Sequence, residues 1–131
     1  MCIRDRGRCA HECAMVKVLK DKRLVVYTGD DIDNGCLYKF VSTSKGDLTN
    51  GNLYVASLED KKWIEVNFKK HKILQKKFKN QVEVLTYLRQ SAKLIGGTEL
   101  DRPEDIKIDP FNDNVITVSY THLTLPTTPY V

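Results

Sequence analysis

The feature that most constrains the fold is a series of five short β-prone segments, each closed by residues that favour turns. The first alternates apolar and polar residues, and the second is a β-branched run that ends at Gly29. Strands this short, at near-regular spacing, predict a sandwich, a barrel or a propeller blade. The five segments are residues 13–19, 23–29, 36–42, 52–58 and 62–68.

The hydrophobic periodicity changes after Asn80, where apolar residues begin to recur at helical spacing. Asn80 is in position to cap the N-terminus of a helix, with Glu83 at the capping-box position, and Gly96 is in position to end it. We therefore expect a mainly β chain with one inserted α-helix at about 81–95. Two further short strands are expected after this helix.

The two ends of the chain are related through the DNA that would encode them. The codons ATG TGT ATA AGA GAC encode residues 1–5, and the reverse complement of that string encodes Val-Ser-Tyr-Thr-His, the sequence of residues 118–122. Such an inverted pair is typical of a sequencing adapter joined to both ends of a DNA fragment. We expect residues 1–6 and 118–131 to be adapter-derived, and residues 7–117 to carry the domain.

Charge and cysteine content exclude few functions. The chain has 21 Lys and Arg against 17 Asp and Glu, and a net charge of +4 does not by itself imply a nucleic-acid partner. The sequence contains no apolar run of transmembrane length, so no membrane partner is expected. Cys9, Cys13 and Cys36 lack the CxxC spacing of a zinc site, and we expect them to be packing residues or free thiols.

Three polar clusters are notable because apolar strands flank them: AHE at 10–12, GDD at 29–31 and DRPE at 101–104. Carboxylates at strand ends supply the hard oxygen ligands that Ca²⁺ prefers. The planar guanidinium of Arg102 suits a pair of phosphate oxygens, and Pro103 restricts the backbone beside it. Each cluster also has a purely structural interpretation, as a turn or a surface ion pair.

Taken in order, these blocks resemble the PhoX-type alkaline phosphatases. The resemblance rests on AHECAMVKVLKDKRLVVYTGDD, LYKFVS, GNLYVASL and GGTELDRPEDIKIDP, which follow the family order and span nearly all of 7–117. It implies a partial β-propeller of one to two blades, with the remainder of the propeller missing from this chain. The implied parent is a longer enzyme that is periplasmic or secreted. Leu100 and Gly97 are mild departures from the Met and Ala usual in the family.

The resemblance also implies a chemistry, the hydrolysis of phosphomonoesters by a cluster of Ca²⁺ and Fe³⁺ ions. Glu12 and Glu104 match metal ligands of the family, and Arg102 matches the arginine near the substrate phosphate. Asp30 and Asp31 match the GDD block, either as metal ligands or as residues that shape the loop. Since the remaining ligands lie outside this chain, we expect the chain alone to be inactive.

Two other functions remain open at this stage. A noncatalytic β-propeller interaction module would keep the scaffold without the metal site. A basic nucleic-acid-binding domain would centre on the lysine-rich segment 69–79. We expect that segment instead to be a solvated insertion before the helix, with no nucleic-acid partner, because runs of like charge usually solvate a face.

Overall fold

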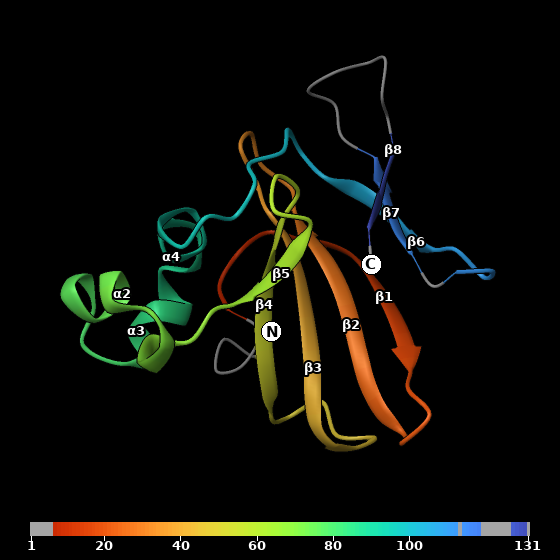
Figure 1. The fold of residues 1–131 in the computed structure, drawn as a ribbon, viewed down its shortest axis with the longest axis horizontal. Coiled ribbons are helices and arrows are strands. Elements are labelled where there is room, and N and C mark those ends of the chain that lie inside the picture. The colour runs from red at the N-terminus through yellow and green to blue at the C-terminus, as the bar shows by residue number, and fades with distance from the viewer. Residues whose placement is uncertain (1–6, 113, 119–126, 131) are drawn as a thin grey trace.

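The computed structural model describes residues 7–112, 114–118 and 127–130, and these form a mainly β protein, as the sequence predicts. Five antiparallel strands make one sheet in which each strand pairs with the next along the chain (Figure 1). This meander is the strand order of a propeller blade extended by one strand. The strands are β1 (His11–Val18), β2 (Arg23–Asp30), β3 (Leu37–Lys45), β4 (Gly51–Ser57) and β5 (Lys62–Glu65).

A second, smaller antiparallel sheet contains β6 (Glu104–Ile108), β7 (Val115–Val118) and β8 (Thr127–Tyr130). Strand β6 lies beside β1 and β2, so the two sheets are in contact. Together they correspond to one to two blades of a propeller, as predicted. The predicted adapter-derived ends lie partly outside the described residues, although β8 and the last residue of β7 fall within them. The origin of both ends stays a prediction.

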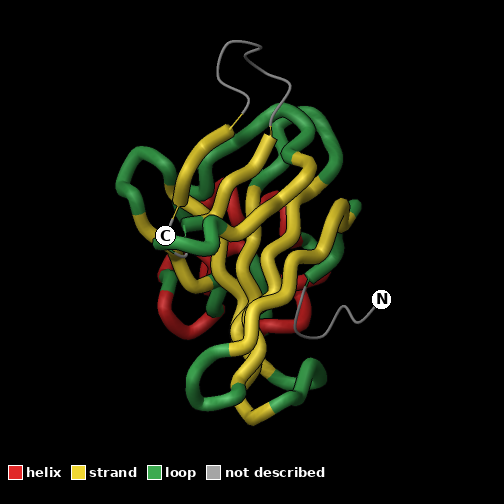
Figure 2. The backbone as a smooth tube through the Cα atoms, turned by 90° about the vertical axis from the view of Figure 1, so that its right-hand side faces the viewer, coloured by secondary structure: helices red, strands yellow, loops and turns green. Residues whose placement is uncertain are grey.

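The helices gather on one face of the five-stranded sheet, and the small sheet lies on the other (Figures 1 and 2). They are the 3₁₀ helix η1 (Phe68–Lys70), α2 (Lys72–Lys77), α3 (Gln81–Thr86) and α4 (Leu88–Leu94). Among the described residues, no helix has the length and apolar character needed to cross a membrane.

The predicted helix at 81–95 is confirmed in its place, but it is interrupted at Tyr87. This residue leaves the helical conformation, with φ −102° and ψ 47°. Its ring stacks on that of Phe78, with the ring centroids 6.0 Å apart. At the start of α3, the Asn80 side chain accepts a hydrogen bond from the Glu83 backbone N–H (2.9 Å), which confirms the predicted cap.

The lysine-rich segment was predicted to be a solvated insertion, and this is wrong for two of its apolar residues. Leu74 is fully buried and Phe78 nearly so. Their spacing of four positions places them on one side, against the sheet, while the lysines lie outside. The segment is therefore part of a packed helical layer, although its charged side chains are solvated as expected.

Each face of the five-stranded sheet has its own hydrophobic core, because successive strand residues point to opposite faces. Tyr38 and Phe40 of β3 face the helices, whereas Leu37 faces the small sheet. The helices do not cover β1, where Val16 and Val18 remain 49% and 58% exposed. One part of the sheet thus keeps an uncovered apolar surface.

Candidate functional site

The AHE and GDD clusters meet because β1 and β2 are antiparallel neighbours. The start of β1 lies beside the end of β2, with His11 opposite Asp30 and Glu12 opposite Gly29. The loop that follows is tied back to the same place, since the Asp31 N–H donates to the Ala10 carbonyl oxygen (2.9 Å). Two clusters 17 or more positions apart are therefore adjacent at one end of the sheet.

The DRPE cluster reaches the same end of the sheet through backbone contacts. The Leu100 N–H donates to the Gly35 carbonyl (2.7 Å), and the Arg102 N–H donates to the Ile32 carbonyl (3.0 Å). Pro103 then packs directly on Gly29, where a Cβ atom would lie 2.6 Å from the Pro103 carbonyl oxygen. The glycine of GDD is thus required for this close approach of two backbones.

Arg102 and Asp31 form an ion pair between the second and third clusters. The Arg102 Nε–H donates to Asp31 Oδ1 (3.1 Å), and the two side chains are partly exposed. Arg102 has a φ of +50°, a left-handed conformation that costs a residue with a side chain about 1 kcal/mol. Such conformations persist where the surrounding contacts impose them, and they concentrate at functional sites.

Asp30 is fully buried, and its carboxylate is held by Arg89 of α4. Arg89 Nε donates to Oδ2 (2.7 Å) and Nη2 donates to Oδ1 (3.0 Å), and Oδ1 also accepts from the Ala10 N–H (2.9 Å). The hydrogen bond to Asp30 raises the pKa of Arg89 further above its usual range. Asp30 therefore joins the beginning of β1, the end of β2 and the helical layer.

Sequence reasoning missed Arg89. The available signal was indirect: an aspartate at the end of a strand with β-branched and aromatic residues becomes buried, and a buried carboxylate needs a charged or hydrogen-bonded partner. Nothing in the sequence indicated which cation would serve.

A second pair of carboxylates lies in the same loops. A hydrogen bond with Asp33, burial and the charge of Asp33 together raise the pKa of Asp101. The Asp101 carboxyl therefore retains its proton to a higher pH than an ordinary aspartate does. With Asp31, these residues make this end of the sheet rich in oxygen ligands.

The predicted metal ligands are only partly placed. The backbones of Glu12 and Glu104 both adjoin Gly29, the first by strand pairing and the second through Pro103, but their side chains lie outside the described part of the structure. Among the side chains that are described, no three His, Cys, Asp or Glu gather to hold an ion. Asp31 fits a hard cation by its chemistry, whereas both oxygens of Asp30 are already hydrogen-bonded.

The histidine of AHE is engaged on both ring nitrogens. Its Nε2 donates to the Gly7 carbonyl oxygen (3.1 Å), and its Nδ1 lies 3.2 Å from the Thr28 hydroxyl oxygen. The described thiols are also enclosed: burial, followed by the charge of Asp30, raises the pKa of Cys9 to about 12, and burial raises that of Cys36 to about 11. Both thiols are therefore protonated at neutral pH and behave as packing residues.

The sequence matches the family model described as alkaline phosphatase PhoX over residues 2–126. The match extends into both ends that we predict to be adapter-derived. It therefore includes the AHE, GDD and DRPE clusters together with the strands that carry them. No curated protein matches the chain.

A solved structure shares the fold. It is the Pseudomonas fluorescens PhoX in complex with vanadate, a transition state analogue, and it is 35% identical to this chain with a TM-score of 0.74. The similarity covers 85% of this chain and 23% of that one. The chain thus spans about a quarter of the length of the structure that it resembles.

Proposed function

Since this chain belongs to the PhoX family of alkaline phosphatases, we propose that it is a segment of a metal-dependent enzyme that hydrolyses phosphomonoesters. The observation that carries the proposal is the convergence of AHE, GDD and DRPE around Gly29. These clusters lie far apart in the sequence, and the fold gathers at one end of the sheet an arginine that suits a phosphate group and carboxylates that suit hard cations. Vanadate, named as a transition state analogue in the similar PhoX structure, is consistent with phosphoryl transfer.

In this proposal Arg102 binds the substrate phosphate. Its guanidinium presents a planar set of donors that suits phosphate oxygens, and the ion pair with Asp31 restricts how the guanidinium can turn. The charge of the guanidinium favours a dianionic phosphate and stabilises charge that develops on the phosphoryl oxygens. The left-handed backbone at Arg102 is a strained conformation of the kind that concentrates at functional sites.

Glu12, Glu104 and Asp31 would hold the metal ions, which we propose to be calcium and iron. When bound, the ions would supply Lewis-acid charge at the phosphoryl group. Asp30 would not be a ligand. Its hydrogen bonds to Arg89 and to the Ala10 N–H occupy both carboxylate oxygens, so its role would be to stabilise the loop that carries Asp31.

We propose that the chain alone is inactive. A site with several ions needs all its ligands at once, and the chain covers only 23% of the similar PhoX structure. The noncatalytic interaction module would keep the same fold, so the two proposals differ only in what the complete protein does. Export of that protein to the periplasm or the medium also stays a prediction.

The decisive experiment is to express the full-length protein that carries this segment and to measure hydrolysis of p-nitrophenyl phosphate together with bound metal. Arg102→Lys is expected to lower kcat/KM by about a hundredfold with metal content unchanged. The reason is that a lysine ammonium keeps the charge but lacks the planar pair of donors with which a guanidinium binds two phosphate oxygens. Glu104→Gln is expected to lower both activity and metal content.

Arg23→Lys is the matched control. Arg23, the first residue of β2, also pairs with an aspartate, Asp21, but this pair lies beside the β1–β2 turn and away from the three clusters. Activity should be unaffected by this change. A full-length protein that binds no metal and hydrolyses no phosphomonoester would overturn the proposal in favour of the interaction module.

A further inference from the structure

All the net positive charge of the chain lies in the lysine-rich segment 69–79. This segment contains six lysines and no acidic residue, so in a chain of net charge +4 the rest carries −2. Lys70 pairs with Glu65 (3.1 Å), and no further ion pair to these six lysines is found within the described ranges. Most of this charge therefore faces solvent and is available to an external anion.

An apolar side chain lies within this charged surface. Ile73 of α2 is 41% exposed, although most isoleucines are buried. Helical spacing places Lys76 and Lys77 one turn beyond it on the same side. Lys69 and Lys70 precede the helix in η1. We call these five residues the lysine face.

A groove adjoins the lysine face between the end of α2 and α4. It has a volume of about 410 Å³, and Phe78 and Leu94 give it an apolar lining. Lys77 and Lys93 stand at its sides, the latter within 3.3 Å of Glu99. Because Lys93 is paired with Glu99, the charge that the groove offers comes from Lys77, and an apolar groove beside that ammonium suits an amphiphile whose head is anionic.

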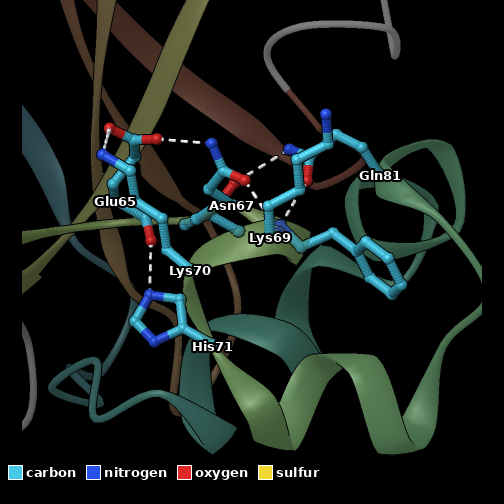
Figure 3. Close-up of polar contacts among 8 residues, drawn as sticks. Glu65, Asn67, Lys69, Lys70, His71 and Gln81 are labelled. Atoms are coloured by element: carbon cyan, nitrogen blue, oxygen red, sulfur yellow. Dashed lines mark hydrogen bonds and ion pairs between the residues drawn. The ribbon is translucent and has the colours of Figure 1, made fainter.

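The lysine face is held in place by hydrogen bonds at its base (Figure 3). Asn67 donates to the Glu65 carboxylate (2.6 Å) and accepts from the Lys69 N–H (2.9 Å). His71 Nε2 donates to the Glu65 carbonyl oxygen (2.8 Å). Gln81 of α3 bonds the backbone on both sides of Asn67 (2.7 and 2.8 Å). The backbone that leads into the lysine face is thus fixed before anything binds, and the ordering that binding requires falls on the lysine side chains.

We propose that the lysine face and its groove bind the surface of an anionic phospholipid bilayer. Clustered lysines are attracted to the negative potential of such a surface, and apolar side chains among them enter the boundary between headgroups and acyl chains. Nucleic acid fits less well, because the segment has no arginine and its aromatic ring, Phe78, is nearly buried and so cannot stack on a base. The proposal revises the expectation that the chain has no membrane partner, and it does not depend on phosphatase activity.

The test is flotation of the purified chain with two kinds of vesicle. One contains phosphatidylcholine alone and is neutral, and the other contains equal parts of phosphatidylcholine and phosphatidylglycerol and is anionic. Flotation separates bound protein from self-associated protein, which sinks. We expect binding only to the anionic vesicles, decreasing as salt is added. Lys76→Gln with Lys77→Gln should lower the partition coefficient about 25-fold, at about fivefold for each lysine. Ile73→Ser should weaken binding to a similar degree at low and high salt.

The matched control is Lys20→Gln with Lys22→Gln, which removes the same charge from the exposed β1–β2 turn. Binding of this variant should stay within about twofold of the unchanged chain, because the charge removed lies outside the lysine face. An equal loss in both double variants would refute a specific surface. Equal binding to neutral vesicles, or binding to duplex DNA but to neither vesicle, would also overturn the proposal.

Discussion

Replacing Arg89 with Met tests how strongly the fold depends on the buried Asp30 carboxylate. Arg89→Met keeps the aliphatic stem but removes both donors to Asp30, which is fully buried. Leaving one charge of a buried pair without its partner costs about 3–5 kcal/mol. Since the Arg89 side chain is 44% exposed, water can partly replace it, and we expect a loss of about 3 kcal/mol in the free energy of unfolding.

Removing the charge as well should recover part of this loss. Asn at position 30 can still accept the Ala10 N–H without a buried charge. We therefore expect Asp30→Asn combined with Arg89→Met to be more stable than Arg89→Met alone by about 1–2 kcal/mol. The assay is urea unfolding followed by circular dichroism, with midpoints compared at equal m-values. If Arg89→Met is unfolded in water, the double variant should be measurably folded.

The control is Arg23→Met, which breaks the exposed pair with Asp21 and should change stability by less than about 0.5 kcal/mol. Two results would refute the reasoning. One is a cost for Arg89→Met no greater than that of the control. The other is a double variant that is no more stable than Arg89→Met alone, which would mean that the unpaired charge of Asp30 carries no cost.

Three further outcomes are expected. Cys9 and Cys36, whose pKa values are raised to about 12 and about 11, should resist alkylation by iodoacetamide at pH 8 in the folded chain and react after unfolding in urea. Peptide mass spectrometry would detect the alkylated cysteines, and rapid labelling without urea would contradict this prediction. Asn80→Ala should cost about 1 kcal/mol by loss of the α3 cap, measured by urea unfolding, while an unchanged midpoint would exclude that role. Val16→Thr with Val18→Thr should reduce self-association in sedimentation velocity, and a chain that is already monomeric would show that this exposed surface is harmless.

Local sequence signals predicted most of the strands and one helix boundary. The five strands of the main sheet begin within a few residues of the predicted segments, because alternation and turn residues act over neighbouring positions. The Asn80 cap was predictable for the same reason. Helix α2 was not predicted, because the six lysines of segment 69–79 masked Leu74 and Phe78, the two buried residues that attach this segment to the sheet.

The three polar clusters of the candidate site were predictable from the sequence, but their meeting at one end of the sheet was not. Antiparallel pairing of β1 and β2 follows from their short connection, and it already brings AHE to GDD. The arrival of DRPE at Gly29 depends on the path of the chain across the helical layer, which local pattern does not encode. The Asp31–Arg102 pair joins residues 71 positions apart for the same reason.

By itself, the sequence determined the strands, the turns, the α3 cap and the identity of the residues available for phosphate and metal chemistry. Only the tertiary structure decided their partners. It paired Asp30 with Arg89, 59 positions away, and paired Asp31 with Arg102. Two adjacent aspartates therefore have different roles, and Asp30 stabilises the loop that carries Asp31. The physical reason is that periodicity and turn propensity are local properties, whereas the partner of a buried charge is chosen by packing between segments that are distant in the chain.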